Sequence, residues 1–320
     1  MKRIITALVT TFVMVLSLTA CGNNTEGTVA VTNKINPVQA DNIDEKNTAQ
    51  EVETEEPAAE PTTVPTTEPT TEPTATPPEP SVEYVELPAE DFTYSYDEAL
   101  EGIIITRYNG TAKGAIRIPA EIDGAPVKEI GQGAFSSKQF HYIIIPDGVT
   151  SIGDHAFKSC IHLREITIPG SVTSIGAYAF SGCKALGNVT IPNSVTSIGE
   201  SAFAYCSFLG SVTIPDGVTS IERNTFTMCE NLTSVTIPDG VTSIGEEAFL
   251  GCARLTSITI PDGVTSIGEQ AFAAFGGTSI TIPDSVESIG KGAFRNCSNN
   301  LTVTYKGQEY TRKSDTDWWG

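Results

Sequence analysis

The sequence has few basic residues and no apolar run long enough for a transmembrane helix. Lys and Arg together number 19 against 39 Asp and Glu, so the formal net charge is −20. Because nucleic acids are bound through Lys and Arg side chains that neutralise phosphates, this balance excludes a nucleic acid as partner. The apolar run at residues 4–16 is shorter than the roughly 20 residues that a membrane-spanning helix needs.

Residue types suited to catalysis and metal binding are also scarce. The three histidines are His141, His155 and His162. The sequence contains no nucleophile elbow, Gly-rich phosphate loop or H-E-x-x-H motif. His155 shares its place in the repeat described below with Tyr178 and Ser201, which predicts an exposed, unconstrained position. We therefore expect no enzymatic activity, no cofactor and no metal site.

Residues 1–20 form a targeting segment. Lys2 and Arg3 precede the apolar run, and the sequence LTAC, which ends at Cys21, follows it. This order resembles the lipobox of bacterial lipoproteins, in which a signal peptidase cuts before the cysteine and the thiol carries a diacylglycerol. The resemblance implies a lipid anchor on Cys21 and a chain that faces outward from the bacterial cell envelope. An ordinary secretory signal with an unmodified cysteine is the alternative.

Residues 21–90 are expected to form a disordered tether. Residues 22–80 hold 12 acidic and 2 basic residues, a net charge of −10, together with many Thr and Pro. A segment of this composition cannot bury enough apolar surface to offset the entropy of ordering it. Its prolines favour extended polyproline II conformations. The tether would lift the rest of the chain off the membrane.

A 23-residue repeat dominates the remainder of the chain. The pattern I-P-x-[GS]-V-T-S-I begins at Ile145 and recurs at intervals of 23, 23, 23, 23, 23 and 22 residues, after a degenerate copy at Ile118. Such self-similarity predicts a solenoid in which each unit buries its apolar side against its neighbours. We expect the solenoid over residues 118–300, between caps at 91–117 and 301–320.

The unit that begins at residue 232 illustrates the expected local structure. Residues 232–237 alternate as a short strand, and the following I-P-D-G predicts a type I turn with Pro second and Gly fourth. Residues 241–244 form a second extended piece. Residues 246–252 are expected to form a helical turn that places a Phe and a Cys in the core.

The whole unit, I-P-x-S-V-T-S-I-G-x-x-A-F-x-x-C, resembles the BspA-like leucine-rich repeats of bacterial surface proteins. The resemblance covers residues 92 to 305 and implies an α/β solenoid of mostly short parallel strands with helical turns. Proteins of that family are displayed at the surface, and some bind host matrix proteins or other cells. Gly or Ser replaces the usual Asn of leucine-rich repeats. The backbone N–H and C=O groups between strand and turn must therefore find other hydrogen-bond partners.

The two ends of the solenoid need caps, since each would otherwise expose an apolar face and strand edges. Residues 92–108 predict two strands joined by D-E-A-L-E-G, a hairpin that closes the first face. Residues 301–305 alternate, and Tyr310, Trp318 and Trp319 follow. We expect these aromatics to cover the last coil, with a binding site as the alternative.

Six further cysteines occupy one place in the repeat: Cys160, Cys183, Cys206, Cys229, Cys252 and Cys297. Six cysteines in an exported protein suggest disulfides. However, residues one coil apart are separated by about 4.8 Å, whereas the Cβ atoms of a disulfide lie about 3.8 Å apart. Phe275 fills the same place in the remaining full unit. We therefore expect a buried ladder of free thiols and neither disulfides nor a zinc site.

Places that vary between units are candidates for recognition. The strand threonines do not vary and suit an exposed strand face, although a flat Thr face also resembles ice-binding solenoids: Thr167, Thr190, Thr213, Thr236, Thr259 and Thr281. Tyr178, Tyr205, Phe208, Arg223 and Met228 are of the types enriched in interface cores, so we predict a partner-binding surface there. Ordinary single exposed apolar residues are the alternative interpretation.

Together these features predict an anchored adhesion or binding protein. The solenoid would act as a monomer and present a rigid surface to an extracellular protein or glycan. The alternative is a structural or assembly component of the bacterial cell envelope that has no foreign ligand.

Overall fold

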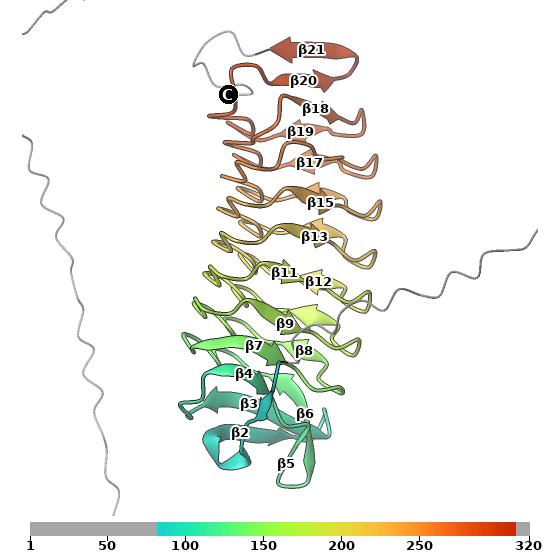
Figure 1. Cartoon of the computed structure of the whole chain (residues 1–320). Helices are drawn as coiled ribbons and strands as arrows, with labels where there is room; N and C mark the ends of the chain where they lie inside the picture. The colour runs from blue at the N-terminus through green and yellow to red at the C-terminus, as the bar shows by residue number, and fades with distance from the viewer. Residues whose placement is uncertain (1–81, 312–320) are drawn as a thin grey trace, which may run out of the picture. The chain divides into compact units, whose positions relative to one another are not determined.

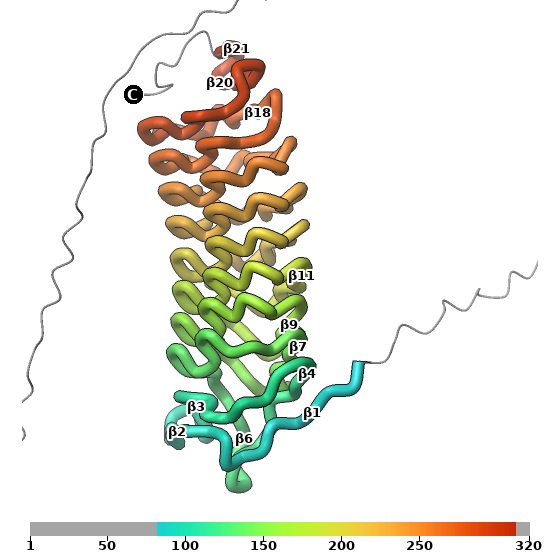
Figure 2. The backbone as a smooth tube through the Cα atoms, turned by 60° about the vertical axis from the view of Figure 1, so that its left-hand side comes forward, coloured from blue at the N-terminus to red at the C-terminus, as the bar shows by residue number. Residues whose placement is uncertain are grey.

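The fold is given by a computed structural model, which describes residues 82–311 as a stack of similar coils (Figures 1 and 2). Each coil passes through two strand columns and returns through a bend. Most coils contribute a short strand to both columns, whereas residues 257–259 have a first-column place but form no strand. The predicted signal peptide, Cys21, most of the predicted tether, Trp318 and Trp319 lie outside the described residues.

The first strand column is a parallel sheet in the order β1-β4-β7-β9-β11-β13-β15. Its strands are β1 (Val85–Glu86), β4 (Gly114–Arg117), β7 (Phe140–Ile144), β9 (Glu165–Thr167), β11 (Asn188–Val189), β13 (Ser211–Thr213) and β15 (Ser234–Thr236). Residues 23 apart pair directly, as Val212 does with Val235. The predicted parallel solenoid with a 23-residue period is therefore confirmed.

The second strand column consists of two sheets. The first has the order β12-β10-β8-β6-β3-β2, with β5 beside β6, and the second has the order β14-β16-β17-β19. The strands of the first are β2 (Phe92–Asp97), β3 (Gly102–Tyr108), β5 (Glu121–Ile122), β6 (Ala125–Ile130), β8 (Ser151–Ile152), β10 (Ser174–Ile175) and β12 (Ser197–Ile198). Those of the second are β14 (Ser220–Ile221), β16 (Ser243–Ile244), β17 (Ser266–Ile267) and β19 (Ser288–Ile289).

Antiparallel hairpins lie at both ends of the stack. β2 and β3 pair in the stretch where the sequence predicted two strands. At the other end, β18 (Ser279–Ile282) pairs with β20 (Thr302–Tyr305), which forms a hairpin with β21 (Gln308–Thr311). Strand β1 and the buried Leu87 belong to the fold, although the sequence assigned both to the tether.

The bends contain no helix, so the predicted helical turns are wrong. The one helix of residues 82–311 is the short 3-10 helix η1 (Ala89–Asp91). In the bends, successive N–H groups alternate between an acceptor in the same bend and an acceptor in the next coil. Ala156 N–H donates to Gly153 O in its own bend, and Phe157 N–H donates to Ala179 O in the next coil at 2.8 Å. A helix would keep these bonds within the bend. The structure instead uses them to join neighbouring bends.

This alternation requires left-handed backbone at two places in each bend, such as His155 with φ +59° and Ser159 with φ +60°. His155 is half-buried, and Ser201 in the equivalent place is buried. The prediction of an exposed, unconstrained place there is wrong, because the bend fixes the backbone and stacks each residue on the next coil.

The I-P-D-G turn lies one residue later than predicted. Its hydrogen bond runs from Val149 N–H to Pro146 O, so the proline is the first residue of the turn. Serines take over part of the role of the missing Asn: Ser171 Oγ donates to Val149 O at 2.7 Å. Side chains therefore join neighbouring turns in the coils that carry Ser.

The core is a column of stacked phenylalanines. Neighbouring rings from Phe135 to Phe294 have centroids 5.3–5.7 Å apart and planes within 16° of each other. Such aromatic pairs contribute about 0.5–1.5 kcal/mol each beyond burial of their area. The same side chain at the same place in each coil therefore gives a continuous aromatic core.

The six cysteines of the repeat form a second buried column and are free. Each thiol donates to the carbonyl oxygen of a Phe in the preceding coil, as Cys206 Sγ does to Phe180 O at 3.3 Å. Burial raises the pKa of the Cys206 thiol to about 12, so the thiol stays neutral near pH 7. Phe275, which takes the same place in its coil, is also buried.

One residue explains why the second strand column is divided. In most coils a glycine follows the isoleucine of this column: Gly131, Gly153, Gly176, Gly199, Gly245, Gly268 and Gly290. A Cβ at Gly199 would lie 2.5 Å from the backbone nitrogen of Ala177 in the preceding coil. The remaining coil has Glu222 in this place, and no strand pairing joins its β14 to β12. We attribute the break to the side chain that Glu222 brings to this close approach.

Candidate functional site

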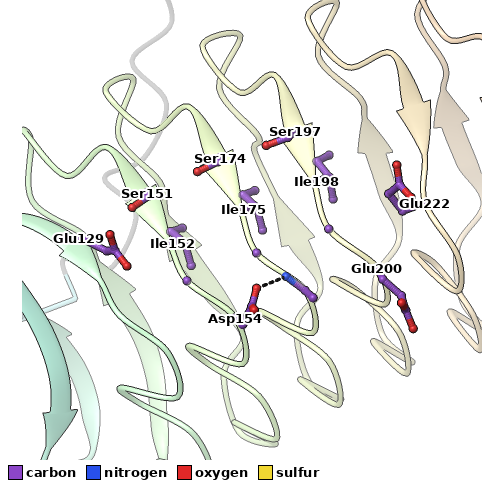
Figure 3. A pocket seen from close by; sticks show the side chains of 14 residues that line it. Glu129, Ser151, Ile152, Asp154, Ser174, Ile175, Ser197, Ile198, Glu200 and Glu222 are labelled. Atoms are coloured by element: carbon purple, nitrogen blue, oxygen red, sulfur yellow. Dashed lines mark hydrogen bonds between the residues drawn. The ribbon is translucent and has the colours of Figure 1, made fainter.

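A groove of about 610 Å³ runs along the second strand column, across β8, β10 and β12 (Figure 3). The serines that begin these strands and the glycines that follow them line it, together with four carboxylates: Glu129, Asp154, Glu200 and Glu222. No basic side chain lines the groove. Sequence reasoning missed it, although acidic residues recur after the glycine, as at Asp154 and Glu200.

Several of these carboxylates are already engaged. Asp154 Oδ1 accepts from Ala177 N–H at 2.8 Å, and Glu200 Oε1 accepts from the Tyr178 hydroxyl at 2.9 Å. Ser220 donates to Glu222. The bonds of Asp154 and Glu200 join neighbouring coils, whereas that of Glu222 lies within its own coil, so the groove is in part a structural feature.

A second depression, of about 410 Å³, lies beside Phe208 at the end of the bend. Its lining comes from three successive coils: Arg164, Glu165, Ala185, Gly187, Asn188 and Phe208. The Phe208 side chain is 66% exposed, more than any other large apolar residue of the described chain. Phe208 is the predicted binding residue that borders this depression.

Tyr205 and Met228 occupy the same place on successive bends. The Tyr205 N–H donates to Thr227 O, and both residues have left-handed backbone, with φ +61° and +57°. Tyr205 is 52% exposed, whereas Met228 is half-buried, with its sulfur close to Gly251. Neither residue lines the depression beside Phe208.

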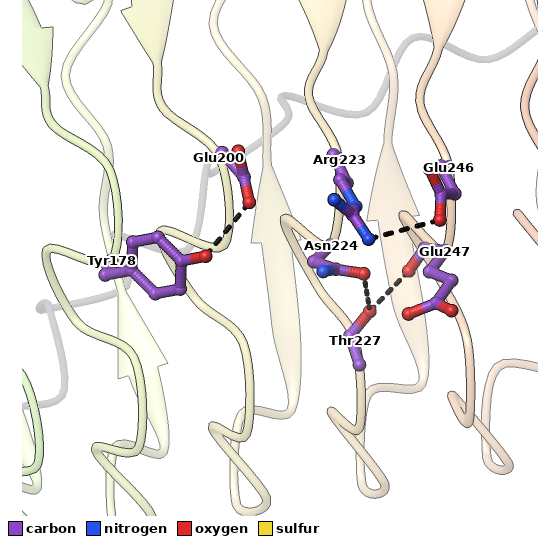
Figure 4. Close-up of polar contacts among 7 residues, drawn as sticks. All are labelled: Tyr178, Glu200, Arg223, Asn224, Thr227, Glu246 and Glu247. Atoms are coloured by element: carbon purple, nitrogen blue, oxygen red, sulfur yellow. Dashed lines mark hydrogen bonds and ion pairs between the residues drawn. The ribbon is translucent and has the colours of Figure 1, made fainter. Parts of the chain in front are cut away.

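Tyr178 and Arg223 are held by other side chains (Figure 4). The Tyr178 ring stacks on His155 with centroids 4.9 Å apart, and Lys158 Nζ lies 5.1 Å from its centroid. Arg223 forms a 3.2 Å ion pair with Glu246. Of the five residues singled out from the sequence, Phe208 borders the depression, and Tyr178 and Arg223 are engaged by other side chains of the protein.

The threonines of the first strand column are exposed, including Thr190 and Thr213. Within residues 82–311, no group of three His, Cys, Asp or Glu side chains is arranged to hold a metal ion. The helices of this same part of the chain include none that is long and apolar enough to cross a membrane.

Comparison with known proteins gives consistent matches to bacterial leucine-rich repeats. A family model described as a BspA type leucine rich repeat region matches residues 128–239 and 219–314, with six copies. The crystal structure of a T. pallidum leucine-rich repeat protein is similar, with 34% identity, a TM-score of 0.57, and 60% of this chain and 89% of that chain covered.

Two further solved structures are also similar. A leucine-rich cell surface protein from Faecalibacterium prausnitzii has 30% identity and a TM-score of 0.57, with 71% of this chain and 77% of that chain covered. A leucine-rich repeat protein from Bacteroides ovatus has 29% identity and a TM-score of 0.54, with 67% and 66% covered. A search of curated protein sequences finds no significant match.

Proposed function

Since the chain belongs to the BspA-type leucine-rich repeat family, we propose that it is a cell-surface binding protein whose solenoid engages an extracellular protein or glycan. The cell surface description of the similar F. prausnitzii protein supports this location. The proposal includes no catalytic role, and the solenoid acts as a monomer.

The observation that carries the proposal is the exposure of Tyr205 and Phe208 on the same bend of a rigid stack. Large aromatic side chains supply much contact area at a low cost in conformational entropy. Hydrogen bonds to adjacent coils hold this bend on both sides: Tyr205 N–H bonds Thr227 O, and Phe208 N–H bonds Lys184 O. A surface ordered before binding loses little entropy when the partner docks.

The anchor completes this proposal. A diacylglycerol on Cys21 would hold the chain on the membrane, because two acyl chains give a stable anchor. Residues 51–80 alone would span up to about 90 Å at about 3.1 Å per residue if extended. The tether would thus carry the solenoid away from the lipid surface.

Metabolic labelling with a fatty-acid analogue tests the anchor. We expect wild type to be labelled and Cys21→Ser to be unlabelled and either released or unprocessed, because only the thiol accepts the lipid. Equal labelling of the two proteins would contradict the lipid anchor. It would not affect the binding proposal, which is tested by a separate experiment.

The binding proposal is tested with bacteria that display the full chain, applied to wells coated with matrix proteins or glycans. The double variant Tyr205→Ala, Phe208→Ala should lose at least thirtyfold in affinity, because a hot-spot residue contributes about 2 kcal/mol or more. Ile161→Ala is the matched control, since Ile161 is another exposed apolar residue, 48% exposed, on a bend.

Equal losses in the double variant and in Ile161→Ala would indicate general apolar adhesion and contradict a defined surface. Binding that survives the double variant and is lost with Lys at Thr190 and Thr213 would place the site on the strand face. A wild-type chain that binds no coated surface and co-purifies only with envelope proteins would support the envelope-component alternative.

A further inference from the structure

The depression beside Phe208 lies at a coil that has small residues where the preceding coil has large ones. Ala185 lies between His162 and Phe208 in the repeat, and Gly187 takes the place of Arg164. A Cβ at Gly187 would meet no atom within 4 Å, so the space above it is open. The volume of about 410 Å³ falls within the range of about 300–1,000 Å³ that is usual for small-ligand sites.

The size and charge of the depression restrict its occupant. A standard protein interface buries about 800 Å² on each partner and involves about 20–30 residues, far more than the six that line this depression. The one basic residue of the lining, Arg164, is balanced by one acidic residue, Glu165. The lining therefore suits a single small ring without net charge.

The lining of the depression combines apolar and polar groups. Phe208 presents an exposed ring, and Ala185 adds a methyl group. The Arg164 guanidinium offers donors only, the Glu165 carboxylate acceptors only, and the Asn188 amide both. Among residues 82–311, none of these three side chains has a hydrogen-bond or ion-pair partner, so all three are available to a ligand.

We propose that this depression is a subsite for one neutral pyranose unit of a glycan. A pyranose has C–H groups on its faces, which pack on Phe208, and hydroxyls around its edge, which both donate and accept hydrogen bonds. The inference rests on the proposed binding function and selects the glycan from its two partner classes. The acidic groove of Figure 3 lacks this combination, because no aromatic residue lines it.

The test uses the purified full chain and a panel of neutral methyl hexopyranosides and their disaccharides, with affinities measured by NMR titration. Phe208→Ala removes the apolar wall. Gly187→Thr fills the floor, and the fold should tolerate it because Thr233 and Thr256 occupy this place in later coils. Both changes should weaken binding at least tenfold.

Thr256→Gly is the matched control, because Thr256 has the same place in a later coil and does not line the depression. It should bind like wild type, and circular dichroism should show that all variants keep the wild-type fold. Wild type that binds no sugar of the panel would overturn the subsite, as would binding that either Phe208→Ala or Gly187→Thr leaves unchanged. A loss in Thr256→Gly equal to that in Gly187→Thr would also overturn it.

These outcomes are distinguishable from failure of the proposed function. Displayed cells that bind a coated protein through Tyr205 and Phe208, while no sugar binds, would retain the function and reject the sugar subsite. Loss of both forms of binding in the wild-type chain would reject both proposals.

Discussion

Replacing Gly199 by alanine should separate two coils of the solenoid locally. The added Cβ would lie 2.5 Å from the Ala177 nitrogen and 2.7 Å from the Gly176 carbonyl carbon. Both atoms belong to the backbone of the preceding coil, so no side-chain rotation relieves the contact. We expect the two coils to lose their strand pairing here, which is also missing between β12 and β14, where the sequence itself places Glu222.

The cost follows from the bonds at this approach. Gly199 N–H donates to Ile175 O at 2.8 Å, and Thr196 N–H donates to Thr173 O at 2.9 Å. Losing both would cost about 1–3 kcal/mol, and overpacking adds about 1–3 kcal/mol. The lower chain entropy of alanine in the unfolded state offsets about 0.5–1 kcal/mol of this. We expect a net destabilisation of about 1–5 kcal/mol.

Urea unfolding of the full chain, followed by circular dichroism, measures this cost as a lower midpoint. Glu222→Ala is the control, because that place already carries a Cβ, and its free energy of unfolding should change by less than about 0.5 kcal/mol. A repeat array can lose cooperativity, so the slope of the transition should be compared as well. Equal effects of the two substitutions would refute the steric explanation of the break at Glu222.

Two further predictions concern the cysteine column. Cys206→Ala should destabilise the chain by about 1–3 kcal/mol, because it leaves a cavity and removes the thiol donor to Phe180 O. In the same urea assay, the control Ser207→Ala on the adjacent surface should change the free energy of unfolding by less than about 0.5 kcal/mol. Similar values for the two variants would contradict tight packing around Cys206. Raising the pH above 9 should lower the free energy of unfolding by about 1.4 kcal/mol per pH unit for each of Cys206 and Cys252. Burial raises the pKa of both folded thiols from 9.0 to about 12, so the unfolded chain loses these protons first; full stability is present below pH 9 and is lost progressively toward pH 12. Urea titrations at pH 8 and pH 10 check this, and a dependence that is unchanged in a Cys206→Ala, Cys252→Ala variant would contradict it.

The sequence by itself determined the solenoid, its period and most of its buried residues. Apolar residues that recur every 23 positions can be buried only if successive units stack in register, and the pairing of Val212 with Val235 shows this register. The burial of the cysteine place also followed, because Phe275 can replace a cysteine only where apolar volume is needed.

Only the tertiary structure decided the conformation of the bends and the composition of the candidate sites. Helical and left-handed turns of six or seven residues have similar local patterns, and the choice here depends on bonds to the next coil, such as Phe157 N–H to Ala179 O. Phe208 could be selected from the sequence as a variable aromatic residue. Its neighbours Arg164 and Asn188 could not, because residues so far apart in the chain meet only when coils stack.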